Sequence, residues 1–259
     1  MAKFQWMNGE NLPTSITTVV NSSMSLKLVP DPGELVPIPI ILTPPHLAVV
    51  QDENVRKGPN FTTFKLAAKA VGSVRLSAEK SANKLIAGPI AITIEARVSL
   101  PAASTDQGLL ARLLLAETPP PIATTYNFVD AEKAMIWMRV VVSNRLAKPS
   151  VKYASAGAKS INDVIRAKGQ FAGFEDYPTL PGKISSRIDE IVAIANDGSD
   201  RRRDRYKKFV DIALRVAAMA AVKDPSSTGL YFWRTTGHGS PSTEAKKYED
   251  LMGNTFFTL

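Results

Sequence analysis

Side chains able to carry out nucleophilic, metal or acid–base chemistry are unevenly represented in this chain. The 259 residues include no cysteine, which excludes disulfides, thiol nucleophiles and thiolate metal sites. The two histidines, His46 and His238, are too few for a multi-histidine metal site. Acid–base chemistry must therefore fall mainly to carboxylates, and we expect neither a metal nor another cofactor.

Glu117 is the carboxylate whose surroundings indicate chemistry most clearly. It ends the apolar run of residues 109–116 and directly precedes Thr118-Pro-Pro-Pro121. Leucines and alanines around a carboxylic acid disfavour its charged form, so we expect a raised pKa for Glu117. A carboxyl group that stays protonated near neutral pH can donate a proton to the leaving oxygen of a glycosidic bond.

The elements that would position Glu117 follow a helical period. Residues 106–117 place apolar side chains at helical spacing, with Thr105 or Asp106 as the N-cap, and the prolines end this helix. Further helices are expected over about 130–146, after Ser160 in a pattern similar to a capping box, over about 185–196, and from about 199 to 222. Residues 105–259 are therefore predicted to form an α-helical domain.

Residues 1–104 follow the two-residue period of β-strands instead. Strands are expected at 26–29, 35–42, 61–66, 71–78 and 90–100, and the last alternates with Ile90, Ile92 and Ile94 on one face. We therefore expect a small β-sandwich, loosely immunoglobulin-like, which serves as a recognition or delivery domain. His46 is expected to be structural or exposed to solvent.

The second half resembles the cell-wall hydrolase family that includes the SleB-type spore-cortex-lytic enzymes. The segments that carry this resemblance, in chain order, are Leu110-Ala-Arg-Leu-Leu-Leu-Ala-Glu117, Val140-Val-Val-Ser-Asn-Arg-Leu146, Val164-Ile-Arg-Ala-Lys-Gly-Gln-Phe171, Ala217-Ala-Met-Ala-Ala-Val-Lys-Asp-Pro225 with Gly229-Leu-Tyr-Phe-Trp233, and Gly253-Asn-Thr-Phe-Phe257. The resemblance implies a lysozyme-like helical fold, and so an α+β multidomain chain. It also implies cleavage of the β-1,4 bond between N-acetylmuramic acid and N-acetylglucosamine, with Glu117 as the catalytic acid.

The chain departs from the family pattern at two positions near the expected site. The family follows its glutamate with Ala-Arg-Gly-Glu, whereas this chain has Thr118-Pro-Pro-Pro, and the family's last histidine is Thr255 here. Because no second carboxylate is secure, we favour the one-carboxyl route of lytic transglycosylases and keep muramidase hydrolysis as the alternative. The possible second acids are Asp130, Glu132, Glu175 and Asp176.

Four residues are the best candidates for sugar contacts: Gln170, Tyr231, Trp233 and Asn254. Amides can form hydrogen bonds with acetamido groups and hydroxyls, and aromatic faces pack against sugar rings. Phe171, Phe232 and Phe256 are expected to belong to the core, and His238 to face solvent. For Asn144 and Arg145, a structural role and substrate contact are equally open.

The formal net charge of +8 favours an anionic environment. The densest basic cluster covers residues 201–208 and can be either a solvated helix turn or a contact to an anionic polymer. Nucleic acid binding would rest on charge alone, so we do not expect a nucleic acid partner. No apolar run approaches the roughly 20 residues that a membrane-spanning helix needs, so no membrane span is expected.

The predicted partners are peptidoglycan glycan strands, with an immunity protein or a secretion or virion component as possible further partners. The N-terminus shows no signal peptide. We therefore expect synthesis in the cytoplasm and action on the cell wall, in the periplasm, after delivery by type VI secretion, a holin or a virion. The alternative is a non-catalytic wall-binding or phage virion structural protein with a degenerate lysozyme-like domain.

Overall fold

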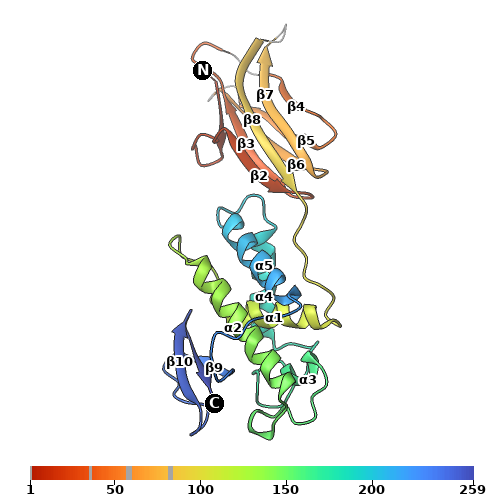
Figure 1. The fold of residues 1–259 in the computed structure, drawn as a ribbon. Coiled ribbons are helices and arrows are strands. Elements are labelled where there is room, and N and C mark those ends of the chain that lie inside the picture. Colours follow the sequence, from red (N-terminus) through yellow and green to blue (C-terminus); the bar gives the residue numbers. More distant parts are fainter. Residues whose placement is uncertain (1, 35–36, 57–59, 81–83) are drawn as a thin grey trace. The chain divides into compact units, whose positions relative to one another are not determined.

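The computed structural model describes residues 2–34, 37–56, 60–80 and 84–259, and the chain forms two compact units (Figure 1). The first unit comprises Met1–Arg97 with Asn196–Arg203, and the second comprises Val98–Ala195 with Asp204–Leu259. The sequence places the domain boundary after residue 104, whereas the units divide between residues 97 and 98. The segment Asn196–Arg203 groups with the first unit although helices of the second unit flank it in sequence.

Two four-stranded sheets build the first unit. One has the order β1 (Lys3–Trp6), β3 (Ser23–Val29), β6 (Phe61–Ala68), β5 (Ala48–Arg56), and the other the order β2 (Ser15–Val19), β8 (Lys84–Glu95), β7 (Gly72–Lys80), β4 (Ile40–Thr43). Alternating side chains of both sheets, such as Leu26 of β3 and Ile92 of β8, lie in one apolar core. The sequence pattern therefore correctly predicts a strand-rich N-terminal part, which the structure forms as two sheets around one core.

Three details of the first unit differ from the expectation. Strand β2 pairs with β8 in parallel, whereas the sheets of immunoglobulin domains are antiparallel. The strand predicted at 35–42 appears only as β4, and residues 35 and 36 lie outside the described residues. Strand β8 ends at Glu95 and not at residue 100.

The helices of the second unit lie close to their predicted positions. They are α1 (Asp106–Glu117), α2 (Phe128–Ala147), α3 (Ile161–Ile165), α4 (Gly182–Ala195) and α5 (Arg203–Ala218), with a short 3₁₀ turn η1 (Val151–Tyr153). The expected caps are present: the Thr105 hydroxyl accepts from the Gly108 amide at 3.0 Å, and Ser160 forms a capping box with Asp163. Helix α1 is buried along most of its length, because its leucines fill the core of this unit.

The predicted lysozyme-like helical fold is wrong for this chain. The described residues form eleven strands in three sheets and five α-helices, and the second unit contains a three-stranded antiparallel sheet. Its strands are β9 (Leu230–Thr235), β10 (Lys246–Leu251) and β11 (Asn254–Thr258), in the order β10-β11-β9.

The family resemblance implies an aromatic strand within 229–233, where β9 lies, with Tyr231 and Trp233 on one face. The sequence pattern misses the other two strands of this sheet for a physical reason. Strand β10 is largely polar and exposed, so it shows no apolar alternation. The turn between β10 and β11 is Met252-Gly253, with φ values of +50° and +74°. Both central residues of a type I′ hairpin turn have positive φ, but methionine is not among the residues that announce such a turn. Strand β9 packs on α2 and carries Trp233 toward the end of α1.

Candidate active site

The backbone that follows Glu117 is fixed from several sides. Thr118 caps α1: its amide donates to the Leu114 carbonyl at 3.1 Å, and its own carbonyl accepts from the Arg187 guanidinium of α4 at 2.8 Å. The Tyr126 hydroxyl donates to the Pro119 carbonyl at 2.6 Å. The proline segment therefore ends the helix in a defined conformation, which holds Glu117 at the margin of the core.

The Glu117 carboxyl group is partly buried and accepts a hydrogen bond from one side chain among the described residues. The indole Nε1 of Trp233 donates to Glu117 Oε2 at 3.1 Å. Burial raises the pKa of Glu117 above its ordinary value, although the Trp233 hydrogen bond and the Arg187 charge act in the opposite direction. The carboxyl group therefore keeps its proton to higher pH than an exposed glutamate would, as the sequence predicts.

Glu117 lies in an open cleft of about 420 Å³. The cleft is lined by Glu117, Arg145, Gln170, Phe171, Ala172, Trp233, Arg234, Thr235 and His238. Among these described lining residues, Glu117 is the only carboxylate. The cleft therefore combines one acid with an amide, two aromatic rings and two guanidinium groups.

Arg145 of α2 holds one wall of the cleft. Its Nε donates to the Tyr231 carbonyl at 2.7 Å and its Nη1 to Gln170 Oε1 at 2.9 Å. The guanidinium also lies over the rings of Tyr153, Phe171 and Phe232. Burial lowers the pKa of Arg145 to about 10, so it remains a cation at neutral pH.

The structure brings together some of the predicted sugar contacts and separates others. Gln170 and Trp233 line the cleft beside Glu117. Asn254 lies buried on β11, where its Nδ2 donates to the Glu117 backbone carbonyl at 3.3 Å, so it contacts the end of α1 and not the cleft. Tyr231 is also buried and stacks on Tyr153, with 5.4 Å between ring centroids.

The sequence does not predict the roles of three residues in or near the site. Arg145 is left open between a structural and a substrate role, and the structure places it in the cleft wall. His238 is exposed, as predicted, and also lines the cleft. Arg187 has no signal beyond its helix, because its approach to Thr118 and Glu117 depends on how α4 packs against α1.

The candidate second acids lie elsewhere on the described surface. Asp130 accepts from the Asn127 side chain at 2.6 Å, and Glu132 pairs with Arg215 at 2.7 Å. Glu175 accepts from the Gly173 amide at 2.8 Å, and backbone hydrogen bonds lower its pKa. None of these three, nor Asp176, is among the described residues that line the cleft.

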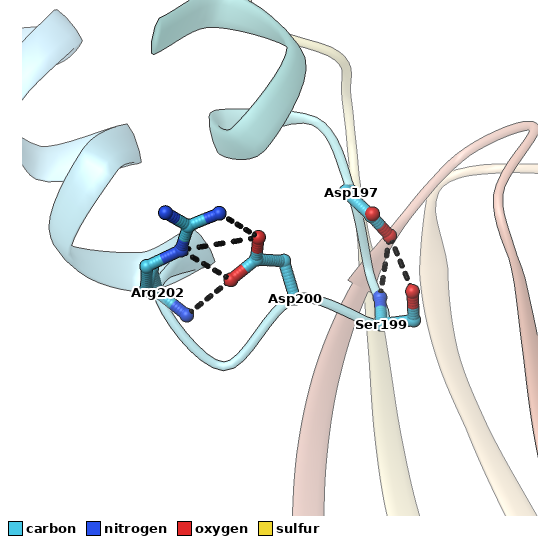
Figure 2. A network of polar contacts seen from close by, with 4 residues as sticks. All are labelled: Asp197, Ser199, Asp200 and Arg202. Atoms are coloured by element: carbon cyan, nitrogen blue, oxygen red, sulfur yellow. Dashed lines mark hydrogen bonds and ion pairs between the residues drawn. The ribbon is translucent and has the colours of Figure 1, made fainter. Parts of the chain in front are cut away.

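The basic segment, residues 201–208, is engaged in contacts within the chain. Arg202 binds the Asp200 carboxylate through its backbone amide and its guanidinium, and Asp197 accepts from both the amide and the hydroxyl of Ser199 (Figure 2). Three further members pair with carboxylates: Arg201 with Glu10, Arg203 with Glu95, and Lys207 with Asp211. Arg205 donates to the Ile122 carbonyl at 3.2 Å, and the Lys208 ammonium lies over the Phe128 ring. These pairings favour a structural role for the segment over a free anion-binding surface.

Comparisons with known proteins identify no family: no protein-family model matches the chain, and no curated protein matches it. The resemblance to SleB-type hydrolases therefore rests on the quoted segments alone. Among the residues that the structure describes, no helix has both the length and the apolar composition needed to cross a membrane.

Proposed function

We propose that the second unit cleaves the glycan strands of peptidoglycan, with Glu117 as the general acid. The observation that carries this proposal is the partly buried Glu117 carboxyl group, with its raised pKa, in an open cleft beside an amide and an indole. General acid catalysis needs a group that is protonated near the working pH and within reach of the leaving oxygen. The raised pKa of Glu117 supports the first requirement, and the open cleft would give a sugar chain access to the carboxyl group.

In the proposed first step, protonated Glu117 donates its proton to the oxygen that links two sugars. The bond between that oxygen and C1 of the muramic acid residue breaks, and positive charge develops at C1. The Trp233 indole N–H donates to Glu117 Oε2, which leaves Oε1 to carry the transferred proton. The indole thus orients the acid without competing for its proton.

In the proposed second step, the C6 hydroxyl of the same muramic acid residue attacks C1. The Glu117 carboxylate, now deprotonated, removes the hydroxyl proton and returns to its acid form, and the product ends in a 1,6-anhydro ring. One carboxyl group is sufficient for both steps. The presence of Glu117 as the only carboxylate among the described lining residues favours this route over hydrolysis assisted by a second acid.

Gln170 and Trp233 are the proposed sugar contacts within the cleft. Arginine can only donate hydrogen bonds, so the oxygen of the Gln170 side chain must face Arg145, and its NH₂ group remains available as a donor. A donor at this position suits the carbonyl oxygen of an N-acetyl group. Trp233, tilted against Phe171 with 5.0 Å between ring centroids, offers an apolar edge to a sugar ring.

The proposed site of action is the cell wall, reached by type VI secretion, through a holin or as part of a virion. In the first case an immunity protein would protect the producing cell. The alternative is a non-catalytic wall-binding or virion structural protein, and the segment Thr118-Pro-Pro-Pro121, which departs from the family pattern beside the acid, is the feature that keeps it open. Activity measurements separate the two.

The direct test is to incubate the purified chain with peptidoglycan sacculi and to identify the released muropeptides by mass spectrometry. We expect ends in 1,6-anhydromuramic acid, lighter than hydrolysed ends by one water. Reducing muramic acid ends would show that the chain is a hydrolase (a muramidase) and not a lytic transglycosylase. Binding to sacculi without any released fragment would support the non-catalytic alternative.

A further inference from the structure

A second hollow lies beside the cleft, in the part of the chain around the β9–β11 sheet. Its volume is about 540 Å³, and it is lined by Thr236, Gly237, Gly239, Ser240, Ala245, Lys247, Asp250, Thr255 and Phe257. Buried Phe257 and Ala245 give it an apolar part, whereas Lys247 and Asp250 bring opposite charges to it. The proposed cleavage steps at Glu117 do not involve this hollow.

The segment of residues 235–240 separates the hollow from the cleft. Thr235 and His238 line the cleft, whereas Thr236, Gly237 and Gly239 line the hollow. The Thr236 amide donates to the Gly253 carbonyl at 2.9 Å, which anchors the segment to the turn between β10 and β11. Neighbouring residues of this one segment line both spaces, so a branched ligand that passes over the segment would reach from one space to the other.

The charged pair at the hollow keeps hydrogen-bonding capacity for a ligand. Lys247 Nζ lies 2.5 Å from Asp250 Oδ2, and the Thr255 hydroxyl donates to Asp250 Oδ1 at 2.5 Å. The ammonium group has three donors, and the carboxylate can accept about four hydrogen bonds. The Lys247 and Asp250 side chains remain 58% and 41% exposed, so both groups can be reached from solvent. The Lys247 and Thr255 hydrogen bonds lower the pKa of Asp250 and keep it ionised.

We propose that this hollow binds the peptide branch of the glycan strand, with Lys247 contacting a peptide carboxylate and Asp250 a peptide ammonium group. The inference rests on the proposed function, because muramic acid carries such a short peptide on its lactyl group. A strand seated in the cleft can send this branch across residues 235–240 into the hollow. The paired charges select a ligand that carries both signs, and Phe257 packs against its apolar part.

The first test measures binding of a free stem tetrapeptide, L-alanyl-γ-D-glutamyl-meso-diaminopimelyl-D-alanine, to the full chain by calorimetry. Lys247→Ala and Asp250→Asn should each weaken binding about five- to tenfold, because each removes one charge-assisted contact. Lys246→Ala is the matched control, since Lys246 neighbours Lys247 on β10 but does not line the hollow. No binding by the wild-type chain, or equal binding by all four proteins, would overturn the proposal.

The second test compares cleavage of intact sacculi with cleavage of glycan strands from which an amidase has removed the peptides. Lys247→Ala should raise KM on intact sacculi about fivefold and leave kcat/KM on stripped strands unchanged. An equal loss on both substrates would contradict a peptide-binding role. The two proposals fail separately: a chain that binds the tetrapeptide but cuts no strand refutes the proposed glycosidase, whereas a chain that cuts strands but ignores the peptide refutes only the hollow's role.

Discussion

The Glu117 cleft and the basic segment of residues 201–208 both contain ionisable side chains, but their surroundings differ. In the basic segment, Arg202 and Lys207 are partly exposed and paired with nearby carboxylates. In the cleft, Glu117 accepts from a neutral indole and Arg145 donates to a neutral amide and a carbonyl. Burial shifts the pKa values of both cleft groups, and a carboxyl group with a raised pKa is suited to proton donation. The denser charge cluster in the sequence is therefore the weaker functional candidate.

The largest stability effect expected from this comparison is that of Arg145→Met. The substitution keeps an apolar chain against the aromatic rings but leaves the Tyr231 carbonyl and Gln170 Oε1 without their donor. We expect the free energy of unfolding to fall by about 2–3 kcal/mol, because buried acceptors without partners are costly. Urea unfolding followed by far-ultraviolet circular dichroism measures this change. A stability equal to that of wild type would show that Arg145 does not hold the cleft wall.

Trp233→Phe should sharpen the assignment of the acid. In wild type, the hydrogen bond from Trp233 to Glu117 Oε2 lowers the pKa of the carboxyl group. Phenylalanine keeps a ring beside Phe171 but removes this hydrogen bond. The pKa should therefore rise, and the alkaline limb of the pH profile of kcat/KM should move to higher pH. We also expect kcat to fall about tenfold, because the acid loses its orienting donor. Trp6→Phe, in the first unit, is the matched control, and an unmoved pH profile would contradict this role for Trp233.

The stability of the chain should depend on pH through Glu117. A carboxyl group with a raised pKa in the folded state stabilises that state below its unfolded pKa, near 4.5, and this contribution is lost as pH rises through the folded pKa. Glu117→Gln has no such titration and still accepts from Trp233. The melting temperature of the variant relative to wild type should therefore increase between about pH 4 and pH 8. Glu190→Gln, on the exposed surface of α4, is the control. If the difference in melting temperature between Glu117→Gln and wild type stays constant over this range, or follows that of Glu190→Gln, the burial of Glu117 is contradicted.

The smallest effect is expected for Arg202→Met in the basic segment. Arg202 is 42% exposed and bound to Asp200 two residues away, and exposed ion pairs contribute little. The free energy of unfolding should change by less than about 0.5 kcal/mol. The same urea experiment as for Arg145→Met makes the two arginines directly comparable. A loss as large as that of Arg145→Met would remove the distinction between the two regions.

Local sequence patterns predict the elements of this chain better than they predict its fold. The run of leucines before Glu117 and the caps at Thr105 and Ser160 place α1 and α3 correctly, because these signals act over a few residues. The aromatic strand β9 is anticipated, but β10 and β11 are not, because β10 is polar and the turn between them is Met252-Gly253. Five short matching segments are therefore not enough to predict a lysozyme-like fold for the whole second unit.

The candidate site shows the same limit. Glu117, Gln170 and Trp233 meet in the cleft as their segments suggest, whereas Tyr231 is taken into a buried stack with Tyr153. Strand alternation places Tyr231 and Trp233 on one face, but it cannot show which neighbours cover each ring. Arg187 reaches the end of α1 from α4, and only the packing of the two helices reveals that contact.

Cleavage of peptidoglycan sacculi by wild type and Glu117→Gln, measured side by side, tests the central claim most directly. Glutamine keeps the shape of the side chain and can still accept from Trp233, but it cannot donate a proton to the leaving oxygen. General acid catalysis typically contributes about 10²–10⁴-fold, so we expect the release of muropeptides to fall by that factor while the variant remains folded. Undiminished release by the folded variant would remove Glu117 from the mechanism and contradict the account.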